Sequence, residues 1–344
     1  MSQSANRQVT LKQVAEAAGV SLSTASRALS GKAEAYRISS RTEKSVRDAA
    51  KKLQFSPSLL ARSLRSQRTK LLGVVLPNIA NPFFAAIARE IALAAEENAF
   101  SVLITDSQEN SETEVHLVEQ LLARQIEGLI VCPVGIRNQH LTKIAKQKLP
   151  LVLVDRGFDH KDLVTVTSDH RAGARAATKL LLESGHRSIG VLQGLPDTLP
   201  NTERLVGVRE AFALQNIAFD PAWIAGNHFD ETSGYQAARK LLSEHPEITA
   251  LFAFSNQNAL GALRAAGELG RTIPADLSLI AFDDHPFAAY LAAPLTSVNQ
   301  DVSQLGRVAA RLLMEQIKTG ALPEEKQHRI PVQLMNRASI KKIG

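Results

Sequence analysis

The residues best suited to hold a small molecule stand where short apolar runs end. These positions are Asp106, Asp155–Arg156, Ser255–Asn256 and Asp283. In an open parallel sheet, a ligand binds beyond the carboxyl ends of the strands. Because one carboxylate can accept hydrogen bonds from two adjacent hydroxyl groups, Asp155 and Asp283 would suit a polyhydroxylated ligand. An alternative role for Asp106 is that of a helix N-cap.

Three aromatic side chains and one arginine could complete such a site. Phe83, Phe84 and Phe229 could stack on the apolar face of a sugar or a base, and we expect one ring of the Phe83–Phe84 pair to be core. Arg204 could donate to ligand oxygens, or it could pair with a nearby glutamate on the surface. Few cations are available for a doubly charged phosphate. We therefore expect an uncharged or singly anionic sugar-like effector, with a purine as the alternative.

A second chemistry is indicated near the N-terminus. Ser23 and Arg27 share the face of a predicted helix that lies opposite its apolar residues. An arginine on such a face can pair with guanine O6 and N7 in a major groove. Leu22 stands at the tip of this helix, where it could join the core or contact a thymine methyl group. The face indicates DNA recognition.

The distribution of charge also favours a nucleic-acid partner. The chain has 344 residues and a net charge of +6, and residues 1–70 hold 14 of its 40 lysines and arginines but only 4 of its 34 acidic residues. The remainder is mildly acidic. Such a basic segment releases counterions when it neutralises phosphates. The alternative is a basic helical hairpin that is simply solvated.

Several function classes are disfavoured by the same sequence. No apolar run approaches the roughly 20 residues of a membrane span, and the N-terminus lacks a signal peptide, so we expect a cytoplasmic protein with no membrane partner. The single cysteine, Cys132, excludes an internal disulfide and a multi-cysteine metal site. No dinucleotide-binding, phosphate-loop or nucleophile-elbow motif occurs. We expect no metal, cofactor or catalytic residue, although a hydrolase that uses Asp283 and His285 is the enzyme alternative.

Three short helices are predicted to position the basic face. Apolar spacing predicts a first helix over residues 11–18, ended by Gly19, and Ser21 is a good N-cap for a second. A third helix is predicted to open with a capping box at Ser40–Glu43. Two short helices joined by a glycine turn are typical of the helix-turn-helix motif.

The rest of the chain predicts two doubly wound α/β lobes with a cleft between them. Apolar runs alternate with helical patterns, and they occupy residues 71–76, 102–104, 128–131, 151–154, 189–192, 250–254 and 277–282, the last of which contains Ser278. Runs that are apolar at every position indicate parallel strands covered on both faces. A last helix is predicted over 301–318 and a final strand over 327–334.

A dense motif occupies the first thirty residues. From Val9 to Arg27 the chain reads VTLKQVAEAAGVSLSTASR, and a long connection follows at residues 31–39. The motif resembles the headpiece of the lactose-repressor/galactose-repressor family, and the connection looks like that of its fructose- and sucrose-repressor branch. The resemblance implies a body like that of the periplasmic sugar-binding proteins. In such a body the chain passes from one lobe to the other three times. It also implies a ligand-responsive repressor that binds a pseudo-palindromic operator.

With this resemblance we expect a set of operator-contacting residues. In the helical unit they are Thr10, Ser21, Leu22, Ser23, Thr24, Ser26, Arg27, Tyr36 and Arg37, and in the hinge they are Ala61, Leu64 and Arg65. In the family the hinge folds on the operator, and a leucine at the Leu64 position wedges between central base pairs. A helix this short is marginal in water alone. The alternative is a basic, flexible linker.

The resemblance also bears on the effector. It places Phe83, Asp155, Arg204, Phe229 and Asp283 in the cleft. Most members of the family read Asn-Asp before the Ala-Leu-Gly of one helix, where this chain reads Ser255–Asn256. The missing carboxylate leaves the identity of the effector open.

The expected domain organisation follows from these elements. The headpiece would comprise residues 1–57, the hinge 58–70, and the effector-binding and dimerisation domain 71–344. Lobe 1 would hold about 71–168 and 299–327, and lobe 2 about 169–298 and 328–344. Since no apolar heptads follow the final strand, we expect a homodimer formed through lobe faces. The expected partners are double-stranded operator DNA, a small-molecule effector and a second copy of the chain.

Overall fold

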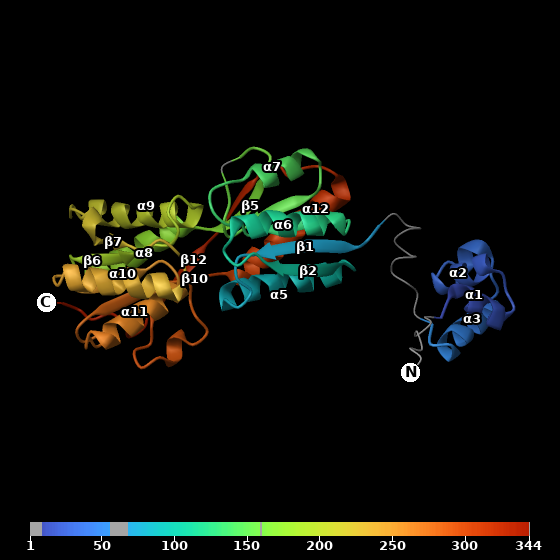
Figure 1. The fold of residues 1–344 in the computed structure, drawn as a ribbon, viewed down its shortest axis with the longest axis horizontal. Helices are drawn as coiled ribbons and strands as arrows, with labels where there is room; N and C mark the ends of the chain where they lie inside the picture. Colours follow the sequence, from blue (N-terminus) through green and yellow to red (C-terminus); the bar gives the residue numbers. More distant parts are fainter. Residues whose placement is uncertain (1–8, 56–67, 159, 344) are drawn as a thin grey trace, which may run out of the picture. The chain divides into compact units, whose positions relative to one another are not determined.

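The computed structural model describes residues 9–55, 68–158 and 160–343. The chain divides into two compact units, Met1–Thr69 and Lys70–Gly344 (Figure 1). The predicted hinge residues Ala61, Leu64 and Arg65 lie outside the described residues.

The first unit is a bundle of three short helices. They are α1 (Leu11–Ala18), α2 (Leu22–Leu29) and α3 (Ser40–Lys52), with a 3₁₀ turn at Glu34–Tyr36. Gly19 ends α1 with a φ of 68°, in the left-handed region that glycine adopts at little cost. Ser21 caps α2 as predicted, because its hydroxyl accepts the N–H of Thr24 at 3.1 Å. The core is small, and it consists of Val14, Ala15, Ala25, Ala28, Val46 and Ala50.

The start of α3 differs from the prediction by one residue. Ser39 rather than Ser40 is the N-cap, and its hydroxyl accepts the N–H of Thr42 at 3.2 Å. Glu43 pairs instead with Arg47 one turn later, at 2.6 Å. Two adjacent serines are equally suitable caps by residue type, so the sequence could not decide between them.

The second unit contains two six-stranded sheets with the same strand order. The first runs β11-β5-β4-β3-β1-β2, and the second runs β12-β10-β9-β8-β6-β7. The strands of the first sheet are β1 (Leu71–Leu76), β2 (Ser101–Asp106), β3 (Gly128–Val131), β4 (Leu151–Val154), β5 (Val164–Ser168) and β11 (Gln327–Ile330). Those of the second are β6 (Ile189–Leu192), β7 (Ile224–Ala225), β8 (Ala250–Ala253), β9 (Ser278–Phe282), β10 (Thr296–Gln300) and β12 (Val332–Met335). All neighbouring strands are parallel except β10 and β12.

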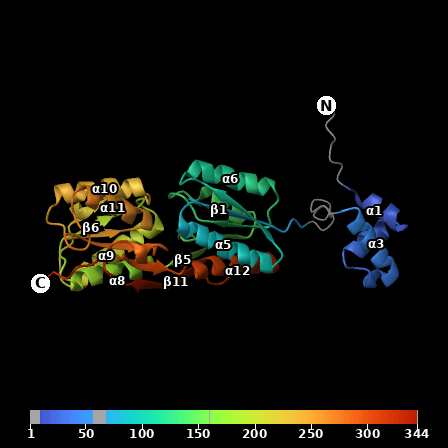
Figure 2. The ribbon, with the colours of Figure 1, turned by 90° about the horizontal axis from the view of Figure 1, so that it is seen from below.

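Helices cover both faces of each sheet (Figure 2). On the first sheet, α5 (Pro82–Glu97) and α12 (Val302–Thr319) pack on one face, and α6 (Ser111–Ala123) and α7 (Gln139–Lys146) pack on the other. On the second sheet, α8 (His170–Glu183) and α9 (Leu199–Leu214) lie opposite α10 (Glu231–Glu244) and α11 (Asn256–Glu268). Every residue of β3, β4, β6 and β8 is buried, which explains their fully apolar sequences. The predicted α/β fold class is confirmed.

The chain passes between the lobes three times, after β5, β10 and β11. The final strand predicted over 327–334 is wrong as a single element. It is two strands, one in each sheet, and Pro331 separates them because proline cannot donate to a ladder. The sequence also missed β5, β7 and β10. Serine, threonine and glutamine interrupt the apolar pattern of β5 and β10, and β7 has only two residues.

Within the described part of the chain, none of the helices is both long enough and apolar enough to cross a membrane.

Candidate functional site

The basic face predicted on α2 is exposed. Ser23, Arg27 and Leu22 all lie on the surface, and the Leu22 side chain is 53% exposed and takes no part in the core. The Arg27 guanidinium lies 4.1 Å from the centre of the Tyr36 ring, in cation–π contact. Tyr36 is half exposed, so it supports Arg27 on the surface rather than packing in the core.

The other predicted DNA contacts lie in the same unit. Thr10 and Ser21 use their hydroxyls to cap α1 and α2, and both remain exposed. Thr24 and Ser26 are half-buried on α2. Arg37 is exposed directly after the 3₁₀ turn, where its φ is 55°. All nine predicted contacts of this unit lie outside its buried core, and their contact with DNA stays a prediction.

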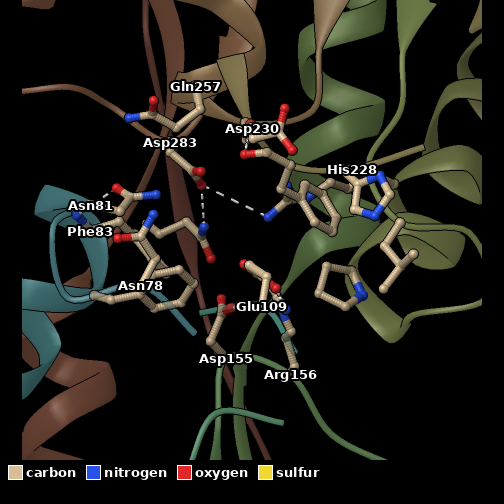
Figure 3. A pocket seen from close by; sticks show the side chains of 17 residues that line it. Asn78, Asn81, Phe83, Glu109, Asp155, Arg156, His228, Asp230, Gln257 and Asp283 are labelled. Atoms are coloured by element: carbon tan, nitrogen blue, oxygen red, sulfur yellow. Dashed lines mark hydrogen bonds and ion pairs between the residues drawn. The ribbon is translucent and has the colours of Figure 1, made fainter. Parts of the chain in front are cut away.

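A pocket lies between the two lobes of the second unit (Figure 3). Residues of lobe 1 that line it are Asn78, Asn81, Phe83, Phe84, Glu109, Asp155 and Arg156. The lining residues from the lobe of the second sheet are Leu195, Pro200, Arg204, His228, Phe229, Asp230, Ser255, Gln257, Asp283 and Gln300. Eight of the ten predicted effector residues are among them.

The two exceptions are Asp106 and Asn256. The Asp106 carboxylate accepts the N–H groups of Ile79 and Gln108 at 3.1 and 2.8 Å, so it joins the loops that follow β1 and β2. It is not the N-cap of α6 either, since Asn110 fills that place. Asn256 begins α11 behind the pocket wall, and its amide donates to Asn81 across the lobes at 3.3 Å.

The Phe83–Phe84 pair also differs from the prediction. Both rings are buried and both line the pocket, whereas one was expected to be core only. Both residues lie in the first turn of α5, which borders the pocket. Their rings meet edge to face with centroids 5.1 Å apart, so the two rings line the pocket together. Phe229 faces them from the other lobe.

Asp155 and Asp283 occupy equivalent places in the two sheets. Asp155 follows β4 and Asp283 follows β9, and both have a positive φ, of 64° and 71°. Aspartate tolerates this left-handed conformation better than most residues. The two carboxylates enter the pocket from opposite walls (Figure 3). Burial raises the pKa of Asp155 to about 6 and also raises the pKa of Asp283.

Two buried arginines lie beside these carboxylates, and Nε of Arg156 is 4.0 Å from Asp155 Oδ2. Arg156 makes a bidentate pair with Glu109, at 2.7 and 2.8 Å. Arg204 donates to the carbonyl of Phe254 and to Nδ1 of His170, and its terminal nitrogen lies 3.8 Å from Asp283.

The surface role left open for Arg204 is excluded by its partners and its burial. Its two neighbouring glutamates are engaged elsewhere, because Glu203 pairs with Arg329 and Glu210 with Arg171. Burial lowers the pKa of Arg204 from its ordinary value. The guanidinium also stacks on Phe282, with its carbon 3.7 Å from the ring centre.

His170 is a buried residue that sequence reasoning missed. Since an arginine can only donate, Nδ1 of His170 accepts from Arg204, and Nε2 carries the proton. That N–H lies 3.1 Å from the hydroxyl of Thr167, at the end of β5. Burial, together with the Arg204 charge, lowers the pKa of His170 well below its ordinary value. A neutral histidine thus joins the end of a lobe 1 strand to a lobe 2 arginine.

Nine lining residues were not predicted, and most are polar residues of loops. They are Asn78, Asn81, Glu109, Leu195, Pro200, His228, Asp230, Gln257 and Gln300. Gln300 could have been found from the end of β10, had that strand been recognised. Its amide donates to the Asp283 carboxylate and fixes one of its oxygens. Glu109 lies in an irregular loop after β2, which carries no periodic signal.

Four buried polar atoms around the pocket lack a hydrogen-bond partner among the described residues. Three are acceptors, namely Asp155 Oδ1, Asn256 Oδ1 and Gln300 Oε1, and one is the Nε donor of Arg204. Buried polar groups are ordinarily satisfied. A molecule with several hydroxyl groups can donate to the acceptors and accept from the arginine. Within the described residues, no cluster of histidine, cysteine, aspartate or glutamate could hold a metal ion.

Two sequence profiles match the chain. Residues 10–58 match "Bacterial regulatory proteins, lacI family", and residues 178–340 match a "Periplasmic binding protein-like domain". The ribose operon repressor of Halalkalibacterium halodurans is 33% identical, over 96% of this chain and 97% of that protein. The repressor PurR of Aliivibrio fischeri is 31% identical, over 90% and 92%.

A solved structure is similar over almost the whole chain. It is the lac repressor dimer bound to operator and the anti-inducer ONPF, with a TM-score of 0.85 and 26% identity. The similarity covers 97% of this chain and 100% of that one. Both of these relatives are named as repressors.

Proposed function

Because the chain belongs to the lacI family of bacterial regulatory proteins, and is therefore a DNA-binding transcriptional repressor, we propose that an uncharged, sugar-like effector in the interlobe pocket releases it from its operator. The protein would act in the cytoplasm on genes of carbohydrate utilisation. It would bind a pseudo-palindromic operator as a homodimer, since one headpiece reads only a half-site.

One observation carries the choice of effector. Asp155 and Asp283 face the same cavity from opposite lobes, and several buried acceptors beside them are unsatisfied. A polyol in the pocket can donate hydroxyl groups to Asp155 and Gln300, the two of these residues that line it. Phe83 and Phe229 supply apolar surface, one from each lobe, for the C–H face of a sugar ring.

The switch would act through the orientation of the lobes. A ligand that contacts both lobes favours one relative orientation over others. In a dimer, that change would alter the spacing of the two hinge segments at residues 58–70. The predicted hinge helices are too short to be stable alone, so a small change in spacing would suffice to release the DNA.

A thermal-shift screen of sugars, sugar phosphates and nucleobases tests the effector class. We expect uncharged sugars to raise the melting temperature, and we expect the same compounds to weaken operator binding. If only purines stabilise the protein, the sugar proposal is wrong. The aromatic pair Phe83 and Phe229, which could enclose a flat ring, would then favour a purine-type corepressor.

Asp283→Asn tests the placement of the site. Asparagine keeps the shape and tolerates the positive φ, but it loses one strong acceptor. The variant should lose its response to the hit and keep its operator affinity. Asp106→Asn is the matched control, because Asp106 also ends a strand but does not line the pocket. If Asp283→Asn responds to the effector as the wild type does, the effector does not bind in this pocket.

A further inference from the structure

The Glu109–Arg156 pair is built into the pocket wall. Arg156 is almost fully buried, and both of its terminal nitrogens donate to the Glu109 carboxylate. Burial by itself lowers the pKa of Arg156, but the charge of Glu109 outweighs it and raises the pKa above the ordinary value. Arg156 therefore keeps its charge, and it is held by the carboxylate of Glu109.

The position of Arg156 is one that a ligand anion would use. Its guanidinium lies between the rings of Phe84 and Phe229, with its carbon 5.7 and 5.3 Å from their centres. These rings come from different lobes, so the arginine faces the middle of the cleft. The bidentate geometry of Glu109 is also the geometry by which an arginine binds a carboxylate or phosphate ligand.

The remaining charges of the pocket do not favour an anion. Arg204 is the other arginine of the lining, and it is held by Phe254, His170 and Asp283. Against the two arginines stand four carboxylates, from Glu109, Asp155, Asp230 and Asp283. An anionic ligand therefore meets a surplus of negative charge, and loss of Glu109 would reduce that surplus.

We propose that Glu109 determines the charge specificity of the pocket, occupying Arg156 as a built-in anion and thereby excluding phosphorylated and carboxylated ligands. This inference rests on the proposed effector pocket. It assigns to Glu109 the exclusion of anions, whereas Asp155 and Asp283 bind the hydroxyl groups. Glu109 itself is about one-third exposed, so its replacement leaves the core in place.

Inorganic phosphate is a suitable probe, because it carries the excluded charge and needs no knowledge of the effector. Binding is measured by calorimetry at constant ionic strength, with chloride as the balancing anion. We expect no binding to the wild-type protein at millimolar phosphate. Glu109→Gln and Glu109→Ala should bind phosphate at least tenfold more tightly, because Arg156 keeps its charge and loses its bidentate partner, while Asp155 contacts only its Nε, at 4.0 Å.

Two further variants locate the anion. Glu112→Gln removes an exposed carboxylate from the start of α6, outside the pocket, and should behave as wild type. The double variant Glu109→Gln/Arg156→Gln should lose the gained phosphate binding. The proposal is overturned if neither Glu109 variant gains affinity, if wild type already binds phosphate equally well, or if the double variant keeps the gain.

This result is separate from the sugar screen. If no sugar binds but the Glu109 variants gain phosphate, the sugar effector is wrong and the charge filter holds. If a sugar binds and the Glu109 variants gain nothing, the sugar effector holds and the charge filter is wrong.

Discussion

At the scale of single residues, Asp155 lines the pocket, and burial of its carboxylate lowers the stability of the folded protein. Its pKa is about 6 in the folded protein, raised from an ordinary value of 3.8 chiefly by burial. Between these two values the unfolded chain releases the proton and the folded chain keeps it. Stability is therefore lost as pH rises from 4 to 6, and at neutral pH the cost is on the order of 1–3 kcal/mol.

Asp155→Asn should accordingly stabilise the protein. The amide has the same shape and carries no charge to bury, and asparagine also accepts the positive φ at this position. At pH 7–8 we expect a gain on the order of 1–3 kcal/mol in urea unfolding, and a gain that vanishes below about pH 4. A variant that is less stable than wild type at pH 8 would contradict this account.

The same carboxylate makes effector binding depend on pH. Hydroxyl donors bind the ionised form, so below pH 6 the ligand must first displace a proton. We expect the affinity of an uncharged effector to be flat above pH 6 and to fall about tenfold per pH unit below it. Calorimetry between pH 5 and 8 measures this slope. An affinity that does not change between pH 7 and pH 5 would show that the ligand does not use ionised Asp155.

At the scale of elements, α2 separates residues that build the headpiece from residues that are predicted to contact DNA. Ala25 and Ala28 are fully buried and let the helices pack closely, whereas Leu22 lies on the surface. An exposed leucine at the tip of a recognition helix adds little to stability. It can contact a thymine methyl group in the major groove.

Leu22→Ala should therefore change stability by less than about 0.5 kcal/mol and weaken operator binding clearly. Val14, in contrast, is completely buried. Val14→Ala should therefore lower the free energy of unfolding by roughly 1–3 kcal/mol. Urea unfolding and operator titration of both variants measure the contrast. Equal stability losses in the two variants would place Leu22 in the core after all.

Elements also show how far the sequence can be interpreted. Strands made of an unbroken apolar run, such as β3 and β4, were predicted to within about one residue. β5 and β10 were missed because hydroxyl and amide residues interrupt their apolar pattern, although every residue of β5 is buried. The strand-end carboxylates were predicted with the strands. Glu109 and His170 were not, since their roles depend on partners far away in sequence.

At the scale of the whole molecule, the expected assembly is a dimer. A two-fold operator requires two headpieces, so one chain is expected to pair with a second copy. Sedimentation at micromolar concentration should therefore give about twice the mass of one chain. A tetramer under these conditions would contradict the assignment.

The identical strand order of the two sheets has a consequence for how specificity can change. Asp155 and Asp283 follow corresponding strands, so each lobe contributes one half of the pocket from the same place in the same topology. The halves belong to separate cores, and a substitution in one need not disturb the packing of the other. Ligand specificity is then set by the combination of two half-sites, one from each lobe. A chimera that takes one lobe from a relative would inherit half of that relative's recognition, and new effectors could be reached one half-site at a time.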